Sequence, residues 1–216
     1  MILVISIVPN KAMDPISKLT EYFREFPGIG PRQAKRFVYF LLTKNPSYLE
    51  EVSRLILSIK KSIKVCPFCF RFYQNDSTSM NICNICTNQN RDQNQLMIVS
   101  RDIDFEAIEK SKFYNGYYFI LGGTIPILDK EPEKKIRLNE LLNRISNGKF
   151  TEIILSLNAN TEGENTADFI KHCMKNKFPD RDLTISVLGR GLSTGTELEY
   201  SDADTIKNAL KNRERV

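Results

Sequence analysis

The sequence of 216 residues lacks the features that mark several classes of protein. It has no fixed repeat, and apolar residues make up 41% of it, which excludes collagen-like, coiled-coil and disordered chains. The apolar run at residues 1–8 is far shorter than the roughly 18–20 residues of a bilayer-spanning helix. That run also lacks the basic flank of a signal peptide. We therefore expect a cytoplasmic protein with no membrane contact.

Signals of common catalytic chemistry are also missing. No Gly-rich P-loop pattern occurs, so nucleotide hydrolysis is not expected. His172 is the only histidine, and no Ser or Cys motif accompanies it, so a nucleophilic triad has no support. A surface or packing role is expected for this residue.

The positive charge of the chain is concentrated towards its amino-terminal end. The net charge is +5, and residues 1–65 contain 11 Lys and Arg against 5 Asp and Glu, whereas the remainder is close to neutral. A concentrated basic segment attracts polyanions through counterion release, and nucleic acid is the usual partner. A solvated basic helix face would explain the charge alone equally well.

The residues of the amino-terminal part predict a helical module over 13–65. Asp14 fits an N-cap with proline at the next position, and a Pro-Gly-Ile-Gly-Pro segment separates this helix from a second one. A third helix is expected over about 48–63. Its apolar face is predicted to lie inside the module and consists of Leu49, Val52, Leu55, Ile56 and Ile59. Residues 1–12 are interpreted as an N-terminal extension outside the fold.

A different pattern follows the cysteine-rich segment. Short, nearly all-apolar runs near 96–99, 117–121, 152–157 and 183–188 alternate with helical stretches. This alternation predicts βαβ units and a mainly parallel sheet with both faces covered. The fold class expected for the whole chain is α+β with several parts. These are a helical module (13–65), a four-Cys zinc finger (66–88), an α/β domain (95–190) and a C-terminal loop and helix (191–216).

Four of the five cysteines form two CxxC pairs with thirteen residues between them: Cys66, Cys69, Cys83 and Cys86. Two such pairs bring four thiolates to the corners of a tetrahedron, with Zn–S distances of about 2.3 Å. Because protein ligands fill every position, the spacing predicts one structural zinc ion that stabilises a segment with little core of its own. Unliganded or redox-active pairs are the alternative. Cys173 is expected to be a small buried hydrophobe in a helix.

The second motif is Phe-Pro-Gly-Ile-Gly-Pro-Arg-Gln-Ala-Lys-Arg at residues 26–36. Its two glycines permit a tight turn, and the helix that follows presents amide groups suited to a phosphate. Arg32 and Arg36 share a helix face, with Lys35 beside them. The pattern matches a helix-hairpin-helix element, which holds nucleic acid by its backbone. A helical corner with exposed basic residues is the alternative.

The order of these parts resembles the bacterial RecR family of recombination mediators. The resemblance rests on residues 26–32 and 83–86, on Asn-Thr-Glu-Gly-Glu-Asn-Thr-Ala at 160–167, and on Arg-Gly-Leu-Ser-Thr-Gly-Thr-Glu-Leu-Glu-Tyr at 190–200. It implies that the α/β part is a Toprim domain and that the chain forms a ring-like dimer or tetramer. It also implies binding to single- and double-stranded DNA in recombinational DNA repair. With RecO, and with RecF in some organisms, such a protein loads a recombinase onto single-stranded DNA.

The resemblance also indicates that catalysis is absent. Toprim enzymes hold magnesium with a glutamate after the first strand and a later Asp-x-Asp pair. Here Ser100, Asn158 and Asn160 stand at those positions and supply no negative charge. The family resemblance assigns Glu162 and Glu164 to contact with RecO rather than with a metal. An ordinary acidic first turn of a helix explains these two residues equally well.

The competing hypothesis is a Toprim-type magnesium-dependent DNA-processing enzyme. It needs several converging carboxylates. Asp102, Asp104 and Glu106 are available, but they are predicted at a helix start rather than at strand ends.

Overall fold

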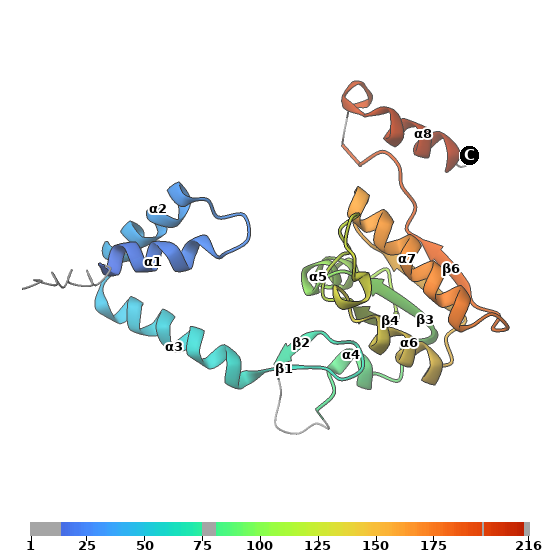
Figure 1. The fold of residues 1–216 in the computed structure, drawn as a ribbon, viewed down its shortest axis with the longest axis horizontal. Helices are drawn as coiled ribbons and strands as arrows, with labels where there is room; N and C mark the ends of the chain where they lie inside the picture. Colours follow the sequence, from blue (N-terminus) through green and yellow to red (C-terminus); the bar gives the residue numbers. More distant parts are fainter. Residues whose placement is uncertain (1–13, 75–80, 196, 214–216) are drawn as a thin grey trace, which may run out of the picture. The chain divides into compact units, whose positions relative to one another are not determined.

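A computed structural model of the chain describes residues 14–74, 81–195 and 197–213 (Figure 1). The interpretation of residues 1–12 as an extension lies outside these ranges. The chain divides into two compact units, Met1–Lys61 and Ser62–Val216. None of the described helices is both long and apolar enough to cross a membrane.

The described residues of the first unit form three helices, α1 (Pro15–Arg24), α2 (Pro31–Leu42) and α3 (Pro46–Ser62), the last of which ends one residue past the boundary of the unit. Asp14 caps α1 as predicted, because its Oδ1 accepts hydrogen bonds from the backbone amides of Ile16 and Ser17. Helices α1 and α2 pack against each other through buried residues of α2 and through an edge-on contact between the rings of Phe23 and Phe37, whose centroids are 5.8 Å apart. The buried residues of α2 are Ala34 and Val38.

Helix α3 forms as predicted, but the prediction for its apolar face is wrong. Leu55, Ile56 and Ile59 are 56%, 61% and 54% exposed, and α3 has no fully buried residue. Leu49 and Val52 are only partly buried. The helical spacing of these residues correctly indicates an amphipathic helix. Spacing cannot indicate which surface covers an apolar face, and no element in the described part of the chain buries this one.

The second unit is built on a parallel sheet of four strands in the order β4-β3-β5-β6. The strands are β3 (Asp92–Val99), β4 (Gly116–Ile120), β5 (Glu152–Ser156) and β6 (Thr184–Val187). In the register of the sheet, Met97 of the inner strand β3 lies opposite Tyr118 and Ile154. The expected parallel sheet and its alternation with helices are confirmed.

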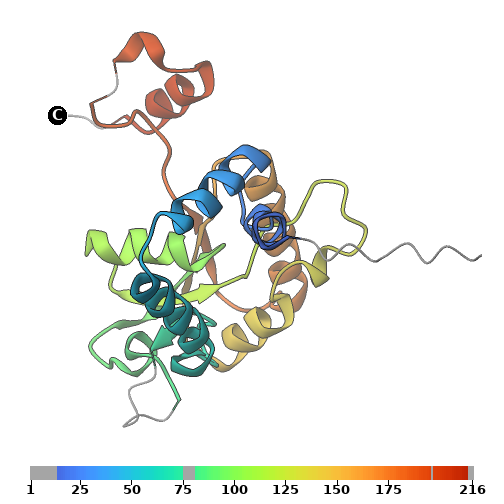
Figure 2. The same cartoon turned by 90° about the vertical axis from the view of Figure 1, so that its left-hand side faces the viewer.

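Helices cover both faces of this sheet, as Figures 1 and 2 show. Leu96 and Ile98 of β3 point to the face that α6 (Leu138–Asn147) and α7 (Thr161–Lys177) cover. Met97 and Val99 point to the opposite face, where α5 (Asp102–Ser111) contributes Phe105. A strand buried on both faces cannot show a polar–apolar alternation, which explains the continuous apolar runs in the sequence.

Shorter elements complete the second unit. An antiparallel hairpin of β1 (Ile63–Val65) and β2 (Phe72–Gln74), together with the short helix α4 (Asn84–Thr87), precedes the sheet. A 3-10 turn, η1 (Pro132–Lys134), leads into α6. The carboxyl-terminal segment contains a second 3-10 turn, η2 (Leu198–Tyr200), and helix α8 (Ala203–Lys211), which Asp202 caps.

Candidate metal centre and DNA-binding surface

The four cysteines of the two CxxC pairs come together. Cys66 and Cys69 lie in the turn of the β1–β2 hairpin, and Cys83 is the N-cap of α4, the helix that contains Cys86. Their Sγ atoms all lie within 4.8 Å of one another, and those of Cys69 and Cys83 are 3.5 Å apart. We call residues 63–74 and 81–87, which carry this cluster, the cysteine knuckle.

The geometry and chemistry of the cluster fit a tetrahedral metal ion. Four sulfurs bound at about 2.3 Å to a central zinc are about 3.8 Å apart, close to the separations found here. Cys66, Cys69 and Cys83 are fully buried and Cys86 is partly buried, so the cluster is largely shielded from solvent. Hydrogen bonds from the thiols of Cys69 and then Cys83 lower the pKa of Cys66, which favours a thiolate within the cluster. The group can therefore hold a metal ion in a structural site.

The cysteine knuckle also packs against one face of the sheet. The backbone amide of Ile120 in edge strand β4 donates a 2.9 Å hydrogen bond to the carbonyl of Cys69. Tyr73 and Ile85 of the knuckle are buried in the same apolar cluster as Tyr118 and Ile120. The metal site thus supports part of the core of the α/β domain.

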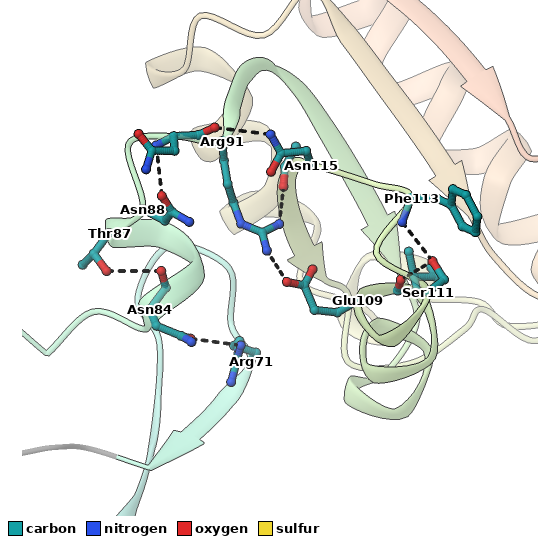
Figure 3. Close-up of polar contacts among 12 residues, drawn as sticks. Arg71, Asn84, Thr87, Asn88, Arg91, Glu109, Ser111, Phe113 and Asn115 are labelled. Carbon is teal, nitrogen blue, oxygen red and sulfur yellow. Dashed lines mark hydrogen bonds and ion pairs between the residues drawn. The ribbon is translucent and has the colours of Figure 1, made fainter.

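A polar network beside this contact was not indicated by any motif in the sequence (Figure 3). The guanidinium of Arg91 is almost fully buried, donates to the carbonyl of Gly116 at 2.9 Å and forms an ion pair with Glu109. Burial, and secondarily Glu109, raise the pKa of Tyr118, so this hydroxyl stays protonated. A single arginine just before a strand gives no sequence signal of such a role.

The segment proposed for DNA contact forms the predicted tight turn. Gly28 has φ +78°, a left-handed conformation that glycine adopts without strain. A Cβ atom at Gly28 or Gly30 would meet nothing within 4 Å, so the backbone is open to a ligand. Gly30 is the N-cap of α2, and no side chain caps the amides of this helix. These amides are therefore available to an anion.

The three basic residues predicted to contact DNA are all exposed. Arg32 and Arg36 lie on the outer side of α2, opposite its buried residues, and Lys35 lies at the flank of that side. None of them forms an ion pair with a carboxylate in the described ranges, so their charges are available to an external anion.

The strand ends where Toprim enzymes hold magnesium have neutral residues here. Ser100 is buried directly after β3, and the side chain of Asn160 is used to cap α7 through the amide of Gly163. The carboxylates considered for an enzyme are also engaged: Asp102 accepts from the amide of Phe72, and Asp104 from that of Arg101. Within the described ranges, the four cysteines are the only group of His, Cys, Asp and Glu placed to share an ion.

The two glutamates at the start of α7 hold neighbouring loops. Glu162 accepts a 3.0 Å hydrogen bond from the hydroxyl of Thr124, and Glu164 forms a 2.6 Å ion pair with Arg190. Both glutamates are exposed. Further along the same helix, His172 is exposed and Cys173 is partly buried against the core.

Comparison with known proteins identifies the family. The family model of the Toprim domain matches residues 94–189, and that of the RecR C-terminal region matches residues 191–214. Recombination protein RecR of Dehalococcoides mccartyi is 34% identical over 199 residues, covering 92% of this chain and 93% of the relative. The RecR of Francisella tularensis subsp. novicida is 34% identical over 208 residues, 96% and 99% of the two chains. The chain belongs to the RecR family.

A third relative agrees: recombination protein RecR of Staphylococcus aureus is 32% identical over 200 residues, 93% of this chain and 96% of the relative. The matches cover nearly the whole chain, so they extend beyond the Toprim domain to the helical module and the cysteine knuckle. The expected family and fold class are confirmed, and the chain is a recombination repair protein.

Proposed function

We propose that this RecR-family protein is a non-enzymatic, DNA-binding mediator of recombinational repair. The observation that carries the proposal is the amino-terminal turn of α2, where open glycine backbone, uncapped amides and three exposed cations occur together. These groups suit the phosphates of a nucleic acid backbone, which carry no sequence information. Arg32 and Arg36 would bind phosphates, with Lys35 in support. Such a protein acts where the chromosome lies, in the cytoplasm.

The cysteine knuckle is proposed to bind one zinc ion through Cys66, Cys69, Cys83 and Cys86. Four clustered thiols, three of them fully buried and that of Cys86 partly buried, favour zinc, because soft thiolate ligands and tetrahedral geometry both suit it. Its role would be structural. The proposed parts of the chain are then a helix-hairpin-helix module at 13–65, the zinc finger at 66–88, the Toprim domain at 95–190 and an assembly segment at 191–216.

We also propose that the chain works in an assembly. The exposed apolar residues of α3, with Leu198 and Leu210 near the carboxyl terminus, supply surface that a dimer or tetramer ring would bury. RecO, and RecF in some organisms, are the proposed partners in loading a recombinase onto single-stranded DNA. Glu162 and Glu164 are proposed to contact RecO, since both carboxylates are exposed at the carboxyl edge of the sheet.

The second candidate, a magnesium-dependent DNA-processing enzyme, is less well supported. Its chemistry needs converging carboxylates, and Ser100, Asn158 and Asn160 are neutral. Incubation of labelled DNA with the protein and Mg²⁺ separates the candidates. We expect the DNA to stay intact. Cleavage that requires Mg²⁺ would support the enzyme instead.

DNA binding is tested by fluorescence anisotropy with the native protein and an Arg32→Ala/Arg36→Ala variant. A Lys60→Ala/Lys61→Ala variant is the matched control, because it removes the same charge from exposed positions at the end of α3. We expect the arginine variant to lose at least about tenfold in affinity at moderate salt and the lysine variant to lose much less. Equal losses of affinity in the two variants would show a general charge effect and contradict specific phosphate binding by Arg32 and Arg36.

A further inference from the structure

Helix α2 has exposed aromatic rings beside its exposed cations. Tyr39 and Phe40 are 50% and 49% exposed, although rings of this size are usually buried when a core is available. They follow Lys35 and Arg36 by four residues each, so each ring lies one helical turn beyond a cation on the same face. We call this surface the aromatic–basic face of α2, formed by Arg32, Lys35, Arg36, Tyr39 and Phe40.

Cations lie over these rings. The Nζ of Lys35 is 5.9 Å from the ring centroid of Tyr39, and the Nζ of Lys44 is 4.3 Å from that of Phe40. Lys44 is also 5.7 Å from the exposed ring of Tyr48 at the start of α3. Each ring therefore sits in a positively charged surrounding rather than in an apolar patch.

The sequence around this face contains no negative charge. Residues 26–49 include four basic residues and five aromatic ones but no Asp or Glu. The exposed apolar residues of α3, by contrast, lie near the acidic pair Glu50 and Glu51. The charge of α2 therefore favours a polyanion over a neutral protein surface as the occupant of its outer face.

We propose that Tyr39 and Phe40 stack on unpaired bases, so that the aromatic–basic face of α2 binds single-stranded DNA in preference to duplex. The inference rests on the proposed DNA grip at Arg32 and Arg36, to which it adds a preference for one type of strand. Phosphate contacts alone do not distinguish single strands from duplexes, because both have the same phosphate backbone. Exposed rings beside a row of cations favour single strands, because only unpaired bases offer an accessible ring face.

The test is anisotropy with a labelled single strand and a duplex of the same length, using Tyr39→Ala/Phe40→Ala. Each stacked base contributes about 1–3 kcal/mol, so the variant should bind the single strand at least about tenfold more weakly. Its affinity for duplex and its salt dependence should be unchanged, because no charge is removed. Tyr22→Ala is the matched control, since Tyr22 is 55% exposed on α1 beside Glu21 and Glu25.

A second readout uses the absence of tryptophan from the chain. In Tyr39→Trp the new indole is the only tryptophan and retains a ring that can stack. Its fluorescence should be quenched by the single strand and not by the duplex, with native single-strand affinity. The oligomeric state of every variant is measured in parallel by sedimentation.

The outcomes separate this inference from the proposed function. If Arg32→Ala/Arg36→Ala weakens binding but Tyr39→Ala/Phe40→Ala does not, the phosphate grip stands and base stacking is wrong. Equal losses for single strand and duplex, or a loss that accompanies disassembly of the oligomer, also overturn stacking. If the native protein binds neither DNA, the proposed grip and the stacking both fail.

Discussion

Loss of the metal site should destabilise the Toprim domain as well as the cysteine knuckle. The perturbation is Cys69→Ser/Cys83→Ser, which removes two adjacent ligands whose sulfurs are 3.5 Å apart. Without a metal ion the knuckle has little reason to stay folded, because its cysteines are its main buried groups. Tyr73 and Ile85 then become exposed, and Tyr118 and Ile120 lose part of their cover.

The magnitude follows from this burial. Full burial of a side chain of this size is worth about 1.5–3 kcal/mol, and realistic unfolded states reduce that value. With partial cover remaining, exposure of these four residues costs about 3–6 kcal/mol. Domains are stable by only about 5–15 kcal/mol, and each kcal/mol lowers Tm by about 2–4 °C at this chain length. We therefore expect Tm to fall by about 6–24 °C.

Calorimetry measures the Tm, metal analysis measures the zinc content, and hydrogen exchange reports on the amide of Ile120, which bonds to Cys69. The amide should exchange faster in the variant. Cys173→Ser is the control, because Cys173 lies outside the cluster and against the opposite face of the sheet. A variant that binds no metal but keeps the native Tm and the protected Ile120 amide would refute this reasoning.

Three further predictions concern positions away from the metal. Gly163→Ala should lower the unfolding free energy by about 1–3 kcal/mol in urea titrations, because its Cβ would lie 2.0 Å from the carbonyl oxygen of Asn158. Gly189→Ala, where a Cβ meets nothing within 4 Å, should have little effect, and equal effects would contradict the packing argument. Arg91→Ala should cost about 1.5–3 kcal/mol, because it leaves Glu109 without its charged partner. Adding Glu109→Gln should restore part of that loss, and no restoration would count against the ion pair. Hydrogen bonds from the Ser17 hydroxyl and nearby amides lower the pKa of Asp14. The capping contribution of Asp14 to stability is therefore fully present above the ordinary carboxyl pKa of about 3.9. It is lost as the pH falls through the lowered pKa of the folded protein. Circular dichroism between pH 5 and pH 2 should show a loss of helix in the native protein that the Asp14→Asn variant does not show. Identical pH profiles for the two proteins would contradict this role of Asp14.

Local chemistry made much of this molecule predictable. The N-cap at Asp14, the glycine turn before α2 and the paired CxxC motifs each depend on residues close together in sequence. All of them occur in the structure. The parallel sheet was predictable for a similar reason, since strands that are covered on both faces have continuous apolar runs in the sequence.

Features that depend on distant partners were not predictable. The apolar spacing of α3 indicates a face but not the surface that covers it, so Leu55, Ile56 and Ile59 were wrongly placed in a core. The bond from Ile120 to Cys69 joins segments some fifty residues apart, and no local pattern encodes it. The aromatic–basic face of α2, which we propose stacks on bases, did have a sequence signal: residues 26–49 contain five aromatic residues and no Asp or Glu. Charge counts over longer segments conceal this signal.

The claim that α2 holds DNA by its phosphates is tested most directly by the salt dependence of affinity. Each phosphate contact adds about 0.7 to the slope of log affinity against log salt for a single strand and about 0.9 for a duplex. If Arg32 and Arg36 each bind one phosphate, their double alanine variant should show a slope smaller by about 1.4 on single strands and about 1.8 on duplex. A variant with the slope of the native protein would place the DNA contacts elsewhere and contradict the account.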